Sequence, residues 1–319
     1  MRIRLTTNEK LMPQLRCLFA LVALGLLGTH TGLGQAWVQP KGHAYVKLSL
    51  SDVTASEQYR FDGERAPYAD NVEGDAFFDE SLYLYGEFGL TDNLTLVATF
   101  PYKNIRVRDA AFDYETEAVG SVMIGLRTGI KNLVGITADQ HTMAANFTVT
   151  LPTGYTRNFT PSVGPGQVDV QTTINYGISL WPFPGYAQAG LGYRLRTSLY
   201  GFSTTTDCED GSDVNCFEDV ETRYDNELLY SAEAGVNLGR WALLQVLTFG
   251  VLSNKTPDAE SSFSIRNPIP SRQRYLKVGG GLTLYPLNKF GVGVQVFFTP
   301  SGRNTIRSTD IFWGVEYRI

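Results

Sequence analysis

The stretch Ser81–Tyr102, S-L-Y-L-Y-G-E-F-G-L-T-D-N-L-T-L-V-A-T-F-P-Y, decides the fold of this chain. Aliphatic and phenylalanine side chains recur at alternate positions on both sides of the turn Gly89–Asn93, and tyrosine or polar side chains fill most positions between them. A period of two residues is typical of a β-strand with one apolar and one polar face. Glycine, aspartate and asparagine in the turn favour a tight reversal, so the stretch predicts an antiparallel β-hairpin.

The start of the chain has the features of an export signal. Four basic residues precede an uncharged apolar run at 17–28, and small residues at 32–34 supply a cleavage site. This pattern predicts a secretory signal peptide at 1–34, which is too short and wrongly flanked to be a membrane-spanning helix. Cys17 begins the apolar run and does not follow the cleavage site, so we expect no lipid anchor.

The composition of the remaining chain excludes several classes of function. Residues 1–34 hold four of the 27 Lys and Arg residues and one of the 32 Asp and Glu residues, so the mature chain has a net charge of −8. An acidic exported chain is a poor nucleic-acid binder. Cys208 and Cys216 share one polar loop, which favours a local disulfide over a metal site because no histidine lies nearby. We expect no cofactor.

The alternation of the hairpin recurs along the whole mature chain. Twelve segments are predicted strands, and all but one of them show it: 43–53, 82–88, 94–100, 120–131, 145–151, 167–180, 187–195, 228–238, 241–252, 276–284, 290–298 and 311–319. The segment 241–252 is apolar in both phases, so the sequence does not orient it.

Ten charged residues in or beside these segments lie on the face opposite to the apolar residues of their own strand. They are Lys47, Glu87, Arg127, Asp169, Arg194, Arg196, Glu233, Lys277, Glu316 and Arg318. A charge that faces lipid at the bilayer midplane costs about 2–4 kcal/mol, so this phase predicts a lipid-facing exterior and an ionised interior. The first eight of these residues are therefore our candidates for lining a lumen. Ion pairs among them either stabilise the interior or line a narrow pathway and set its selectivity.

A soluble β-sandwich would also alternate, but three features favour a membrane barrel. Segments of ten or more residues match the roughly 9–11 that cross a bilayer at a tilt. Short connections at 89–93, 181–185, 239–240 and 286–289 alternate with long ones at 54–80, 103–117, 198–227 and 253–274. Aromatic residues gather at strand ends, with Trp181, Trp241 and Phe290 by the short turns and Phe100, Tyr102, Tyr155, Phe159, Tyr200 and Phe202 by the long loops. We therefore predict an all-β chain in which 35–319 forms one transmembrane antiparallel up-and-down barrel of about 12 strands.

Four stretches resemble the outer-membrane proteins grouped under the meta-pathway of phenol degradation. They are Gln39–Tyr45 (QPKGHAY), Tyr85–Thr91 (YGEFGLT), Leu151–Tyr155 (LPTGY) and Gly185–Tyr193 (GYAQAGLGY). The resemblance implies an outer-membrane barrel that helps small molecules, hydrophobic or aromatic ones among them, to cross. It assigns no functional residues. The chain ends in Ile319, whereas the signal read by the outer-membrane assembly machinery usually ends in an aromatic residue.

The residues themselves favour transport over catalysis. The two histidines of the mature chain, His43 and His141, fall near the predicted short-turn rim, and no sequence context marks a nucleophilic serine beside them. The acidic loop 198–227 has a net charge of −8, which is typical of a solvated loop. The weaker alternatives are a divalent-cation site and a channel mouth that favours cations. A passive channel for small solutes is our first hypothesis. A non-conducting structural or binding barrel acting through its long outer loops is the second, and a lipid hydrolase is a distant third.

Overall fold

The computed structural model describes residues 36–205, 216, 223–261 and 269–319. The predicted signal peptide at 1–34 lies outside these residues, as does Cys208, so the export signal and the disulfide with Cys216 stay predictions. Among the described residues, no helix is long and apolar enough to span a bilayer.

Twelve long strands dominate the described part of the chain. They are β1 (Ala44–Tyr59), β4 (Leu82–Thr91), β5 (Leu94–Arg108), β7 (Val122–Gly129), β8 (His141–Leu151), β9 (Asp169–Ser179), β10 (Gly185–Arg196), β11 (Glu227–Leu238), β12 (Ala242–Ser253), β13 (Arg274–Leu287), β14 (Phe290–Arg303) and β15 (Thr305–Arg318). Each pairs antiparallel with the next, and β15 pairs with β1 from Tyr45↔Arg318 to Tyr59↔Thr305. The closed barrel confirms the predicted fold.

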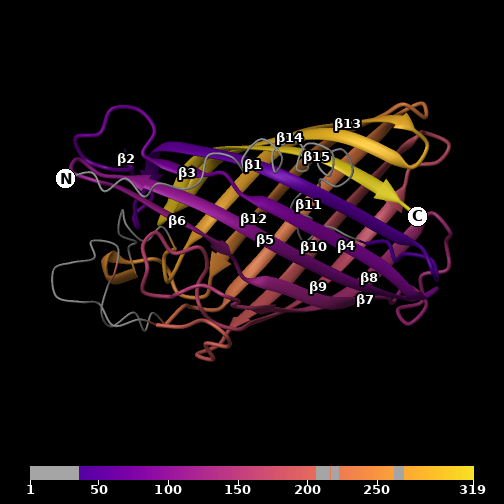
Figure 1. The fold of residues 1–319 in the computed structure, drawn as a ribbon. Helices are drawn as coiled ribbons and strands as arrows, with labels where there is room; N and C mark the ends of the chain where they lie inside the picture. Colours follow the sequence, from indigo (N-terminus) through magenta and orange to yellow (C-terminus); the bar gives the residue numbers. More distant parts are fainter. Residues whose placement is uncertain (1–35, 206–215, 217–222, 262–268) are drawn as a thin grey trace, which may run out of the picture.

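The two ends of the barrel differ in their connections. Asp92 and Asn93 alone join β4 to β5, and similarly brief turns join β9 to β10, β11 to β12 and β13 to β14 at the same end. We call this the short-turn end and the other the long-loop end. The alternation has two exceptions: 130–140 makes a longer link between β7 and β8, and Asn304 alone, at φ 54°, joins β14 to β15 at the long-loop end. In Figure 1, the short strands β2 (Arg65–Pro67), β3 (Phe77–Asp79) and β6 (Asp113–Val119) lie toward one end and the C-terminus lies at the other.

Two of the expected long loops are partly strand. β1 continues to Tyr59 and pairs with β2 and β3, and β5 continues to Arg108 and pairs with β6. These strand extensions form because their apolar side chains pack against one another at the long-loop end, beyond the barrel wall. Ala55, Phe77 and Val107 pack there in a buried apolar cluster, which compensates for the loss of chain freedom. Our expectation of loops over 54–80 and 103–117 was wrong for these parts.

The exterior of the barrel is apolar. The large apolar side chains exposed on its strands include Leu84, Leu96, Ile124, Leu126, Phe147, Ile174, Leu191, Leu284, Val292 and Trp313. A surface of this extent is unfavourable in water and matches the hydrocarbon of a bilayer. β12, which the sequence left without an orientation, turns Leu244 and Val246 outward and Leu243 and Leu247 toward the interior.

Candidate functional site: a chamber inside the barrel

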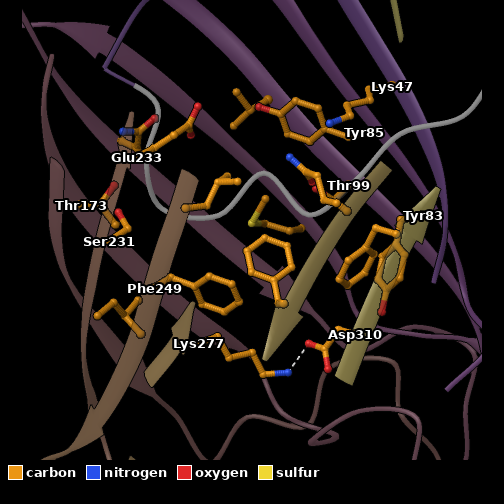
Figure 2. A pocket seen from close by; sticks show the side chains of 18 of the residues that line it. Lys47, Tyr83, Tyr85, Thr99, Thr173, Ser231, Glu233, Phe249, Lys277 and Asp310 are labelled. Carbon is orange, nitrogen blue, oxygen red and sulfur yellow. Dashed lines mark hydrogen bonds and ion pairs between the residues drawn. The ribbon is translucent and has the colours of Figure 1, made fainter. Parts of the chain in front are cut away.

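The barrel encloses one long cavity of about 1250 Å³, to which every one of the twelve long strands contributes at least one side chain. This volume exceeds the roughly 300–1,000 Å³ of ordinary small-molecule sites. Figure 2 shows Lys47 and Tyr85 on one wall, Glu233 on the facing wall, Phe249 farther along, and the Lys277–Asp310 pair beyond it. The cavity, which we call the chamber, is therefore layered along the barrel.

The layer toward the short-turn end holds ionised groups, most of which form ion pairs or hydrogen bonds with one another or with neighbouring tyrosines. Arg127 Nη2 lies 3.1 Å from Glu87 Oε1, with both side chains almost fully buried. Glu316 accepts hydrogen bonds of 2.8 Å from both Tyr45 and Tyr285 and lies 3.0 Å from Arg318.

The carboxylate of Glu233 belongs to the same layer but is held by neutral donors. Gln245 donates at 2.7 Å and Gln188 at 2.9 Å, and the hydroxyl of Tyr186 donates as well. Lys47 stands in register between Glu316 on β15 and Tyr85 on β4. Within the described residues it forms neither an ion pair nor a hydrogen bond, and the carboxylates that attract its ammonium group electrostatically are those of Glu316 and Glu233.

The middle layer of the chamber is aromatic. The rings of Phe249 and Phe297 lie edge to face at 5.4 Å between centroids, and Phe297 contacts Phe312 in the same way at 6.0 Å. Tyr83 extends the row at 6.5 Å from Phe312, and Leu247 packs against it. Because these side chains come from β4, β12, β14 and β15, they form one continuous apolar wall.

The layer toward the long-loop end is again ionised and paired. Lys277 pairs with Asp310, and Lys103 Nζ lies 2.6 Å from Asp79. Together with the pairs nearer the short-turn end, these contacts give the chamber wall a balanced charge.

A second ionised group at this end lies partly behind the chamber wall. Arg194 pairs with Glu227 at 2.8 Å, and Arg196 bridges Glu227 at 3.2 Å and Asp169 at 3.5 Å. Arg194 lines the chamber, whereas Asp169 and Arg196 are buried beside it.

The loop 152–168 narrows the chamber at the long-loop end. Val163 is buried in the apolar cluster, and Gly164 and Pro165 line the chamber with it. Tyr155 anchors the loop: its hydroxyl lies 2.9 Å from Ser121 and accepts the amide of Gly166 at 2.8 Å. Burial raises the pKa of the Tyr155 hydroxyl, so it stays protonated. We predicted Tyr155 to be one of the aromatic residues at the membrane interface. This prediction was wrong, because the loop turns the side chain inward.

The structure brings together six of the eight predicted lumen residues on the chamber wall. These are Lys47, Glu87, Arg127, Arg194, Glu233 and Lys277. His43 also lines the chamber, and His141 hydrogen-bonds Tyr176 on β9. Most of the acidic loop 198–227 lies outside the described residues.

Sequence reasoning missed the aromatic layer. Phe297 and Phe312 stand on the polar phase of strands whose apolar phase was already assigned to lipid, and Phe249 lies in the unoriented segment. The sequence did contain a signal for this layer, namely a large aromatic residue on the otherwise polar phase of a strand.

The closed antiparallel barrel, its apolar exterior and its enclosed chamber define a transmembrane β-barrel. The structure of an outer membrane channel from Pseudomonas putida F1 is similar, with a TM-score of 0.65 and 13% identity over 90% of this chain and 98% of that chain. NanC porin is more distant, with a TM-score of 0.47 and 7% identity over 84% of this chain and 98% of that chain. The CymD monoaromatic hydrocarbon channel has a TM-score of 0.40 and 7% identity over 88% of each chain. No family model matches the sequence, and no curated protein matches it.

Proposed function

We propose that this chain is an outer-membrane channel through which small, uncharged solutes with an apolar or aromatic part cross passively. The observation that carries the proposal is the layering of the chamber, in which an aromatic wall lies between two layers of paired charges. The shared fold with the Pseudomonas putida F1 channel supports the same location and role.

The charge balance of the chamber favours uncharged solutes. An unpaired fixed charge attracts ions of opposite sign. In the chamber wall, Arg127 and Lys277 are paired with carboxylates, so they attract ions only weakly. An uncharged solute can place its apolar part against Phe249 and Phe297 and its polar part toward hydroxyl and amide groups such as those of Tyr186 and Gln245. The resemblance to the phenol-degradation group of outer-membrane proteins supports the aromatic part of this proposal.

Planar-bilayer recording and liposome swelling test the proposal. We expect small conductance steps with weak ion selectivity, and faster swelling of proteoliposomes in a neutral aromatic alcohol than in a charged analogue of the same size. Swelling that follows net charge alone would contradict the assigned solute class.

A non-conducting binding barrel is the second candidate, because the chamber is narrowed at both ends. The loop 152–168 narrows one end, and residues 36–39 lie across the other. Folded protein that neither conducts nor accelerates swelling, yet retains a neutral aromatic solute in equilibrium dialysis, would favour this candidate over the channel.

A further inference from the structure

The segment Ala36–Gln39 lies inside the barrel at the short-turn end. Ala36 is 1% exposed, its amide donates to Gln188 Oε1 at 3.1 Å, and its carbonyl accepts from Thr142 Oγ1 at 3.1 Å. At the other end of the segment, the Gln39 amide donates to Thr95 Oγ1 at 2.8 Å. Both ends of the segment are therefore fixed to the wall.

The middle of the segment is fixed as well. Arg127 Nη1 donates to the carbonyl of Trp37 at 2.9 Å, and the indole ring meets Tyr186 edge to face at 5.6 Å. The side chain of Gln39 donates to Glu87 at 2.6 Å. The partners come from β4, β5, β7, β8 and β10, so four residues contact nearly half of the barrel wall.

The geometry shows that the segment crosses the lumen and does not follow the wall. From β4 to β10 there are five strand spacings of about 4.8 Å each, or about 24 Å around the wall before strand tilt is counted. Three Cα–Cα steps of about 3.8 Å reach only about 11 Å. The long side chains of Gln188, Arg127 and Glu87 bridge the difference by reaching inward.

The close approach of β9 agrees with this path. A Cβ atom added at Gly177 would lie 2.8 Å from the Cβ of Ala36 and 2.8 Å from the indole of Trp37. Trp37 also lines the chamber while 39% of it stays exposed, so its ring projects into the remaining opening.

We infer that residues 36–39 form the inner size filter of the channel, with Trp37 as the residue that limits which solutes pass. This inference rests on the proposed channel function. The filter excludes by cross-section because its backbone is held at both ends, and pore diameter is one of the direct determinants of channel selectivity.

Single-channel recording with poly(ethylene glycol) of graded size tests the filter. We expect Trp37→Ala to raise the conductance by about twofold or more and to admit larger polymers, because the widest side chain of the filter is removed. Trp241→Ala is the matched control, since Trp241 lies at the same end of the barrel but is exposed and does not line the chamber. Its conductance and size limit should equal those of the wild type.

A second variant and a chemical readout separate the possible outcomes. In a background with serine at 208 and 216, Ala36→Cys should resist a bulky maleimide and become reactive when Arg127→Ala is added. Heat-modifiable electrophoretic mobility verifies that each variant folds. If Trp37→Ala conducts like the wild type, or if Ala36→Cys labels fully in the wild-type background, the filter is overturned while the channel stands. If no variant conducts but the cysteine is protected, the channel function fails, and the filter fails with it.

Discussion

Replacing Arg127 with alanine should destabilise the barrel more than any other single change to its chamber wall. Only 4% of the side chain is exposed, and it donates four hydrogen bonds, to Asn146, Trp37, Tyr85 and Glu87. Because Arg127 stands on β7 and Glu87 on β4, it joins strands that are not neighbours. The substitution leaves the Glu87 carboxylate buried without its cation.

The size of the effect follows from that unpaired charge. Removing one partner of a buried ion pair costs about 3–5 kcal/mol. Glu87 keeps its hydrogen bonds from Tyr85 and Gln39, which lowers the cost, so we expect a loss of about 3 kcal/mol in the free energy of unfolding. Adding Glu87→Gln removes the unpaired charge. The double variant should therefore be about 1–2 kcal/mol more stable than Arg127→Ala alone.

Urea unfolding of the refolded barrel in detergent micelles, followed by tryptophan fluorescence, measures these differences. Arg194→Ala is the matched control, because 29% of the Arg194 side chain is exposed and Glu227 retains Arg196 at 3.2 Å. We expect it to cost about 1 kcal/mol or less.

Two results would refute the reasoning. Equal losses for Arg127→Ala and Arg194→Ala would show that burial of the pair does not set its contribution. A double variant of Glu87→Gln and Arg127→Ala that is no more stable than Arg127→Ala alone would show that the unpaired carboxylate is not the cause.

Three further predictions concern the rest of the chamber and its wall. Lys47→Gln should abolish a weak anion preference, seen as a reversal potential closer to zero in a salt gradient, and Lys47→Glu should reverse its sign; an unchanged potential would remove Lys47 from the selective wall. Phe297→Ala breaks two edge-to-face contacts, each worth about 0.5–1.5 kcal/mol, and should slow the entry of a neutral aromatic alcohol more than that of a sugar in liposome swelling. Ile174→Arg should lower stability by about 2–4 kcal/mol in bilayers while Ile174→Leu stays near wild type, and equal stability of the two would contradict a lipid-facing position.

The sequence alone determined the barrel. Alternation places the side chains of each strand on two faces, so the apolar residues at Leu84 and Leu126 and the charges at Glu87 and Arg127 are sorted before any strand pairs. Strand number and the up-and-down order follow from the count of such segments and the short turns between them. The same phase carries the six predicted lumen residues that the structure places on the chamber wall.

Tertiary structure decided what the interior does. Which charge meets which depends on the register of strands that are distant in sequence, as for Arg127 with Glu87, and no local pattern fixes that register. Phe249, Phe297 and Phe312 become one wall only when β12, β14 and β15 curve around a common axis. Residues 36–39 have no strand pattern at all, and their place across the lumen arises because the closed wall offers donors and acceptors that their backbone must satisfy once buried.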